Sequence, residues 1–201
     1  MSKIMVAHDI AASYDGVVRT SDFNAGGVRN DELSRFCADG KLFRIRKGIY
    51  SAVPTDEIAE ERLLAELLPD AIICMESALY IYGYSDHVPT EWNVAVPRTF
   101  SRSRLKIEGL FLKPRFIQQD LFSLGQRTEI INGQELKIYD RERCICDCFK
   151  YRNKMDSELF NKSVTAYAHD PQKNLMNLLD YACKMRVQKK VQEIMEVLLN
   201  G

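Results

Sequence analysis

The stretch Asp39-Gly-Lys-Leu-Phe-Arg-Ile-Arg-Lys-Gly-Ile-Tyr-Ser51 contains two short runs in which apolar and polar residues alternate, separated by the basic sequence Arg46-Lys47-Gly48. Such alternation is typical of β-strands, and a glycine between two runs is typical of a hairpin turn. We therefore expect a two-stranded hairpin with a positively charged tip. Its expected inward-facing residues are Leu42, Ile45, Ile49 and Tyr50.

The sequence predicts an amphipathic helix from about Ile4 to Asp15 and a short strand at Val17-Val18. Two short helical patterns then precede the hairpin. Gly26-Gly27 separates them, as a tight turn between two helices requires. The second pattern runs from about Val28 to Asp39, with Leu33, Phe36 and Cys37 recurring on one face. Gly40 then supplies a left-handed stop. Helix, turn, helix and cationic hairpin in this order are typical of a winged helix-turn-helix, so residues 1–53 are predicted to form a DNA-binding domain.

The rest of the chain mixes strand and helix patterns. Strands are expected at Ile72–Cys74, Trp92–Val96, Leu105–Ile107, Leu110–Leu112 and Glu135–Tyr139. Helices are expected around Leu63–Leu68, through Ala78 and Tyr82 to Gly83, over 141–152 and 157–168, and through the last sixth of the chain. The sequence therefore predicts an α+β protein, in which the winged helix-turn-helix is followed by a mixed α/β domain, residues 54–201, with a helical C-terminal end.

Composition limits the classes of function. The 201 residues are 46% hydrophobic and 28% charged, and their formal net charge is zero. Any nucleic-acid binding must therefore come from local basic patches. No apolar run reaches the roughly 18 residues of a membrane span, and the N-terminus does not have the pattern of a signal peptide. We expect a cytoplasmic protein that does not insert in membranes, with its six cysteines as thiols.

Two groups of residues are candidates for contact with duplex DNA. Arg29 and Asn30 begin the second helix, where side chains of this fold meet base edges, and Ser34 and Arg35 lie away from the predicted buried face. The alternative is a solvated face used only for protein contact. In the hairpin, Arg44, Arg46 and Lys47 suit phosphate groups. The alternative there is a charged tip that protects a strand edge.

A second basic cluster lies in the middle of the chain. Arg98, Arg102, Arg104 and Lys106 are followed by Lys113 and Arg115, and only Glu108 opposes them. These residues are candidates for an additional contact with nucleic acid or with a protein partner. A solvated loop is an equal alternative.

Signatures of catalysis and metal binding are weak. Cys144, Cys146 and Cys148 do not have the paired spacing of a structural zinc site, and we interpret them as buried small hydrophobes. Asp140 is an expected helix N-cap, and Arg143 and Asp147 are an expected i,i+4 pair. No phosphate-binding glycine loop is present. We therefore expect no catalytic residues, no metal and no cofactor.

Several motifs together resemble the AbiEi family of antitoxins. The first part of the chain is similar to the N-terminal domain of that family. The matching residues are Gly16-Val17-Val18, Asp22-Phe23, Gly27-Val28-Arg29 and Gly40 to Tyr50. Four further segments resemble the second domain of that family: Met75-Glu-Ser-Ala-Leu-Tyr-Ile-Tyr-Gly83, Pro89, Asn93 to Pro97 and Asp140-Arg-Glu-Arg-Cys-Ile-Cys-Asp147. The resemblance covers most of the chain and is least specific over the last fifty residues.

The resemblance implies two activities for a protein of a type IV toxin–antitoxin system. The N-terminal domain would repress the operon by binding repeated operator sites in promoter DNA. The C-terminal domain would counter a nucleotidyltransferase toxin without forming a stable complex with it. Two alternatives stay open. One is a plain winged-helix transcriptional regulator with a sensory second domain, and the other is a metal-dependent nuclease.

Overall fold

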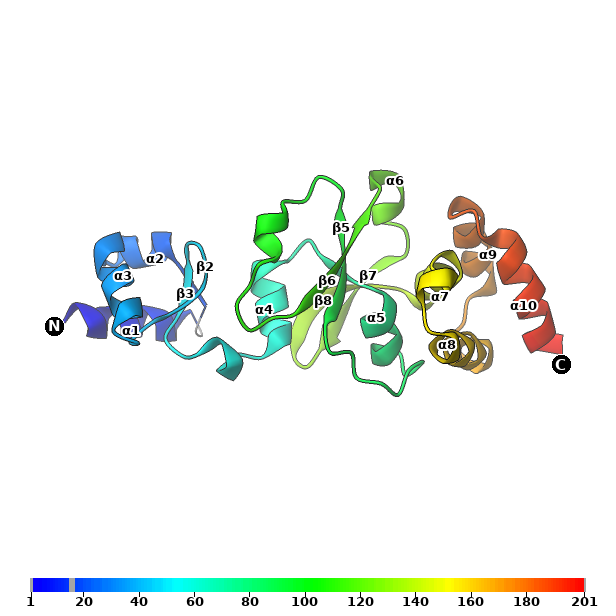
Figure 1. The fold of residues 1–201 in the computed structure, drawn as a ribbon, viewed down its shortest axis with the longest axis horizontal. Helices are drawn as coiled ribbons and strands as arrows, with labels where there is room; N and C mark the ends of the chain where they lie inside the picture. The colour runs from blue at the N-terminus through cyan, green and yellow to red at the C-terminus, as the bar shows by residue number, and fades with distance from the viewer. Residues whose placement is uncertain (1, 15–16, 201) are drawn as a thin grey trace. The chain divides into compact units, whose positions relative to one another are not determined.

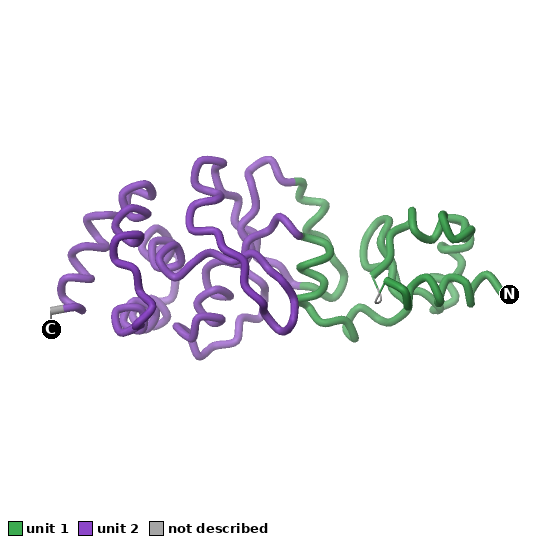
Figure 2. Tube along the Cα trace, turned by 180° about the vertical axis from the view of Figure 1, so that it is seen from behind, with its two compact units in different colours: residues 1–68, 101–110 green, residues 69–100, 111–201 purple. Residues whose placement is uncertain are grey.

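The computed structural model describes residues 2–14 and 17–200, and its fold is of the α+β class (Figure 1). The chain forms two compact units. Unit 1 comprises residues 1–68 and 101–110, and unit 2 comprises residues 69–100 and 111–201 (Figure 2). The predicted class and the helical C-terminal end are confirmed. The domain boundary expected after residue 53 lies within unit 1, because residues 54–68 and 101–110 pack with the first part of the chain.

Unit 1 begins with three helices and a small sheet. Its elements are α1 (Lys3–Ser13), β1 (Val18–Arg19), α2 (Thr20–Ala25), α3 (Asn30–Ala38), β2 (Phe43–Arg46), β3 (Ile49–Ser51), the 3₁₀ turn η1 (Thr55–Glu57), α4 (Glu60–Leu67) and the 3₁₀ turn η2 (Arg102–Leu105). The three strands pair antiparallel in the order β1-β3-β2. Asp15 and Gly16, where the resemblance to the family begins, lie outside the described residues.

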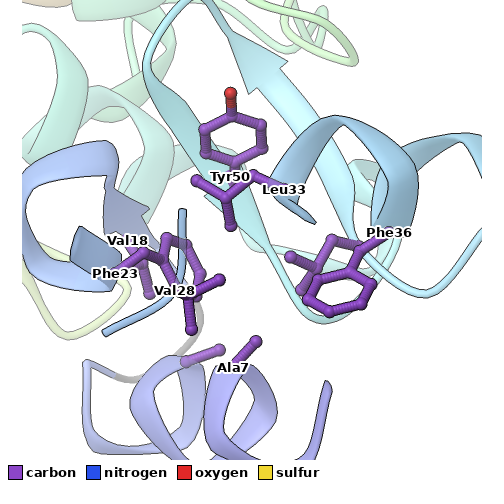
Figure 3. Close-up of a cluster of buried hydrophobic side chains, with 9 residues drawn as sticks. Ala7, Val18, Phe23, Val28, Leu33, Phe36 and Tyr50 are labelled. Carbon is purple, nitrogen blue, oxygen red and sulfur yellow. The ribbon is translucent and has the colours of Figure 1, made fainter. Parts of the chain in front are cut away.

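One apolar cluster holds these helices against the sheet. Figure 3 shows its side chains converging from α1, β1, α2, α3 and β3. Phe23 and Tyr50 meet edge to face, with 6.1 Å between their ring centroids, a favoured aromatic geometry. The other buried members are Ala7, Ala11, Val18, Val28, Leu33, Phe36 and Leu42.

The predicted local pattern of this region is confirmed. The helix α3 buries Leu33 and Phe36, half-buries Cys37, and is followed by Gly40 in the left-handed region with φ +66°. In the hairpin, the four expected inward-facing residues are all buried: Leu42, Ile45, Ile49 and Tyr50.

Residues 101–110 return to unit 1 from the middle of the sequence. The backbone N–H of Glu108 donates to the carbonyl oxygen of Ile45 at 3.1 Å, and Ile107 and Leu110 are buried. The strand expected at Leu105–Ile107 is wrong, since the chain forms η2 and then a single bridge between Ile107 and Leu110. Partners only three residues apart close a turn and leave no room for a ladder.

Unit 2 contains a five-stranded sheet in the order β6-β5-β4-β8-β7. The β5–β6 and β4–β8 pairs are parallel, and the β4–β5 and β7–β8 pairs are antiparallel. The strands are β4 (Ile72–Ile73), β5 (Trp92–Pro97), β6 (Leu112–Ile117), β7 (Gln126–Ile131) and β8 (Gln134–Tyr139). The strand β7 was not predicted.

Helices make up the remainder of unit 2. They are α5 (Met75–Ile81), α6 (Gln119–Phe122), α7 (Arg141–Lys150), α8 (Ser157–His169), α9 (Leu175–Lys184) and α10 (Gln188–Asn200), with the 3₁₀ turn η3 (Arg152–Lys154). The helix α7 packs against α5, α8 and α9, and α10 packs against α9 and α8 (Figure 1).

The helix α7 contains a buried network of charged groups. The Asp140 carboxylate accepts from the backbone N–H of Arg143 at 2.8 Å, which confirms the predicted N-cap. The predicted pair is confirmed as well: Arg143 Nε lies 3.3 Å from Asp147 Oδ2, and both side chains are buried. Arg143 Nη1 also donates to the carbonyl oxygens of Leu121 and Leu124, so the side chain connects α7 to α6 and to the turn after it.

Candidate nucleic-acid interface

The helix α3 presents four of the predicted DNA-contacting residues to solvent. Arg29 is its N-cap residue and Asn30 its first residue, and Ser34 and Arg35 lie one turn further on. All four side chains are exposed. The helical period turns Ser34 and Arg35 away from the buried Leu33, whereas Arg29 and Asn30 are exposed at the N-terminal end of the helix.

Two acids at the start of α3 are engaged with Arg29. Glu32 Oε2 accepts from the backbone N–H of Arg29 at 2.9 Å, which satisfies one donor at the helix N-terminus. Asp31 Oδ2 lies 2.9 Å from Arg29 Nη2 in an exposed ion pair. Glu32 therefore serves as a helix cap. Asp31 instead neutralises the side chain of Arg29, which was predicted from the sequence to contact bases.

The hairpin carries three of the predicted phosphate contacts. Arg46 pairs with Ile49, so Lys47 and Gly48 form a two-residue loop. Gly48 has φ +81°, a conformation that glycine adopts without steric cost. Arg44 is exposed on β2 and Lys47 is exposed at the tip, whereas Arg46 is half-buried.

Arg44 lies close to α3 as well as to the hairpin. Burial raises the pKa of the Cys37 thiol on α3, and the positive charge of Arg44 opposes that rise. The strand β2 therefore carries positive charge from the neighbourhood of α3 to the tip of the hairpin.

A groove of about 710 Å³ opens beside the hairpin, wholly within unit 1. Five cationic residues line it: Arg19, Arg46, Lys47, Arg104 and Lys106. Three hydroxyl groups lie among them, from Thr20, Ser21 and Ser103. Gly48 and Ile49 complete the lining, so no acid is present among the described residues of the groove. We call this feature the basic groove.

The cations of the basic groove are close enough to repel one another. Burial lowers the pKa of the Arg46 guanidinium, and the charges of Arg104 and Arg19 lower it further. Arg46 Nη1 donates to the carbonyl oxygen of Arg104 at 3.1 Å, which fixes the guanidinium beside residues 101–110. Like charges held at short distance favour a bound anion, which would relieve their repulsion.

The basic cluster predicted from Arg98 onward is divided between the two units. Arg104 and Lys106 line the basic groove, and Arg102 lies exposed in the same 3₁₀ turn as Arg104 without lining it. Arg98 belongs to unit 2, directly after β5.

Two further cations of that cluster also belong to unit 2. Lys113 forms an ion pair with Glu76 at 3.4 Å. The Arg115 guanidinium lies 5.3 Å from the centroid of the Tyr151 ring. The residues of the predicted cluster thus belong to two different units.

Arg19, Thr20 and Ser21 were not predicted as site residues. Arg19 enters the groove because β1 pairs with β3, which places Arg19 opposite Ile49. A short strand was expected at Val17-Val18, but its pairing with a strand about thirty positions further on leaves no periodic signal in the sequence. The backbone N–H of Arg19 donates to the Asp22 carboxylate at 3.1 Å, which fixes the start of α2.

Within the described residues, no group of three or more His, Cys, Asp or Glu side chains is placed to hold a metal ion. The three cysteines of α7 are fully buried, as the sequence interpretation expected. Burial raises the pKa of the Cys144 thiol well above its ordinary value, which makes it a poor nucleophile. In the same part of the chain, no helix has the length and apolar character of a membrane span.

Comparison with known proteins identifies a similar fold. No family model matches the chain, and no curated protein matches it in sequence. The crystal structure of the RV2827C protein from Mycobacterium tuberculosis superposes with a TM-score of 0.68, covering 98% of this chain and 75% of that chain, at 14% sequence identity. At this identity the likeness concerns the fold alone.

Proposed function

We propose that this chain binds duplex promoter DNA through unit 1 and represses its own operon. The observation that carries the proposal is the basic groove beside the hairpin that follows α3, whose described lining contains five cations and no acid. The order of helices and the sheet order β1-β3-β2 support a winged helix-turn-helix. Local charge of this kind is the feature that a chain of zero net charge needs for DNA binding.

In this proposal α3 enters the major groove, whose width admits an α-helix. Asn30 and Arg35 then reach base edges, and Arg44, Arg46 and Lys47 bind backbone phosphates. Arg29 must first exchange Asp31 for a base or a phosphate. That ion pair is exposed, so its loss costs about 0.2–1 kcal/mol, less than the roughly 1–3 kcal/mol of one good base contact.

The second part of the proposal is that the chain is the antitoxin of a type IV toxin–antitoxin system. Its support is the resemblance of Met75–Gly83 and Asp140–Asp147 to the AbiEi family. The partner is then a nucleotidyltransferase toxin, which the chain opposes without a stable complex. Both motifs belong to unit 2. The first motif forms α5, and the second forms the N-cap and most of α7.

Fluorescence anisotropy with the full chain tests the first part. The labelled duplexes are the region upstream of the gene and a scrambled duplex of equal length and composition. We expect preference for the upstream region, and a variant carrying Arg46→Ala and Lys47→Ala should lose affinity for both duplexes with a smaller salt dependence. Equal affinity of the unaltered protein for both duplexes would refute the assignment.

A variant of α3 gives the complementary result. Arg35→Ala combined with Asn30→Ala removes the proposed base contacts and leaves the hairpin unchanged. We expect the preference for the upstream region to fall while affinity for scrambled duplex changes little. The reverse pattern would show that α3 is not the element that reads sequence.

Co-expression with the cognate toxin tests the second part. The full chain should restore growth, and the Arg46→Ala, Lys47→Ala variant should restore it equally, because neutralisation is assigned to unit 2. Persistent toxicity with abundant, folded protein would exclude the antitoxin role. If that protein still binds the upstream region, the chain is a plain transcriptional regulator.

A further inference from the structure

We propose that residues 101–110 are part of the DNA-binding surface, and that Lys106 and Arg104 bind backbone phosphates in the basic groove together with the hairpin. This inference rests on the proposed DNA-binding function and identifies a second element that serves it. In sequence, these residues lie between β5 and β6 of unit 2.

The segment is anchored to the hairpin by both backbone and side chain. The Glu108 N–H donates to the Ile45 carbonyl at 3.1 Å, and Arg46 Nη1 donates to the Arg104 carbonyl at 3.1 Å. Ile107, between the two cations and Glu108, is buried. The backbone of residues 101–110 is therefore held beside the strand that carries Arg46, and Arg104 and Lys106 line the same groove.

The charge arrangement calls for an anion. Arg104 is one of the two cations that depress the pKa of Arg46, so the segment adds positive charge where the hairpin is already positive. Positive charge gathered beside the hairpin attracts anions. Lys106 is exposed on the same groove, so its ammonium group is accessible to such an anion.

The composition of the groove favours a polyanion over a small organic ligand. Small-molecule sites are mostly lined by apolar and aromatic side chains. Here the lining is cationic or bears hydroxyl groups, apart from Gly48 and Ile49, and its volume of about 710 Å³ exceeds what one phosphate fills. A nucleic-acid backbone supplies several phosphates at regular spacing, and hydroxyl and guanidinium groups are their usual partners.

The experiment measures the salt dependence of DNA affinity for four full-length proteins. They are the unaltered chain, Lys106→Ala, Lys106→Ala with Arg104→Ala, and the matched control Arg102→Ala. Arg102 has the same charge and lies in the same 3₁₀ turn as Arg104, but it does not line the groove. Circular dichroism and thermal melting establish that each variant is folded.

Counterion release gives the expected size of the effect. Each phosphate contact contributes about 0.9 to the slope of log affinity against log salt. Lys106→Ala should therefore lower affinity about eightfold at about 0.1 M salt, and the double variant about 60-fold, with a slope smaller by about 1.8. Upstream and scrambled duplexes should weaken alike, because phosphates carry no sequence information. Arg102→Ala should leave the slope within about 0.3 of the original.

Each other outcome has a distinct meaning. If the unaltered protein prefers the upstream duplex and the double variant keeps its affinity and slope, this inference is overturned while the proposed function stands. If Arg102→Ala matches Lys106→Ala, the effect is one of general charge and the groove assignment fails. If the unaltered protein does not prefer the upstream duplex, the proposed function fails and this inference fails with it.

Discussion

Replacing Arg143 by Met should destabilise unit 2 by about 3–5 kcal/mol, the cost of leaving one buried charge without its partner. The side chains of Arg143 and Asp147 are 1% and 4% exposed, and Nε and Oδ2 lie 3.3 Å apart. Arg143 Nη1 also donates to the Leu121 and Leu124 carbonyls at 2.6 and 2.9 Å. Met fills a similar volume, so the loss reflects charge and hydrogen bonds more than a cavity.

Urea unfolding followed by tryptophan fluorescence measures this loss. Trp92 is the one tryptophan of the sequence and lies in β5, so its signal reports unit 2. Lys184→Ala is the matched control. Its partner Asp180 has the same i,i+4 spacing, but these side chains are 53% and 52% exposed, and the expected loss is below about 1 kcal/mol. A loss below about 1 kcal/mol for Arg143→Met would refute the argument from burial.

The loss of stability caused by Arg143→Met should also increase as pH rises. Burial raises the pKa of the Asp147 carboxyl, and the charge of Arg143 opposes that rise. Without Arg143 the folded-state pKa rises further, so the folded variant binds a proton that the unfolded chain, with a pKa of about 3.9, has released. Its stability therefore falls as pH rises above about 4, and the penalty should be smaller at about pH 4 than at about pH 7. A penalty that grows on acidification would contradict this account.

Three other substitutions separate folding from binding. Leu33→Ala removes a fully buried side chain and should destabilise unit 1 by about 2–5 kcal/mol, measured by hydrogen exchange of its amides. Gly48→Ala forces an L residue to φ +81°, which should cost about 1–2 kcal/mol and weaken DNA binding by displacing Lys47. Anisotropy and thermal melting check both effects. Asp31→Asn releases Arg29 from its ion pair and should raise DNA affinity up to about fivefold. The same change removes an acid from the start of α3 and should lower stability by about 0.3–1 kcal/mol.

Local pattern was sufficient to predict the elements that carry a strong period or a clear cap. The α3 face, the hairpin and the Asp140 cap were all predicted, because the residues that define each lie within a few positions of one another. The strand β7 was missed since it is a mostly exposed edge strand with little apolar alternation. The dipeptide Asn132-Gly133 is nevertheless a hairpin-turn signal next to this strand. Both residues have positive φ in the two-residue loop from β7 to β8, the geometry that this dipeptide favours.

The basic groove could be predicted only in part. Arg46 and Lys47 could be predicted because they form a basic cluster at a hairpin tip. Arg104 and Lys106 could be predicted because they belong to a second basic cluster. Their meeting, and the arrival of Arg19, depend on contacts between residues far apart in the sequence, such as Arg46 with Arg104. No helical or strand period encodes such contacts, so the sequence leaves open whether the two clusters form one surface or two.

The discontinuity of unit 1 affects how the protein can be dissected. The chain passes from one unit to the other between residues 68 and 69, 100 and 101, and 110 and 111. A stop codon or a protease cut after residue 68 yields an N-terminal fragment without residues 101–110. After the protease cut, the C-terminal fragment keeps Lys106 and lacks Lys47. Exchange of unit 1 between related proteins would therefore have to move a linear piece and an inserted loop at the same time.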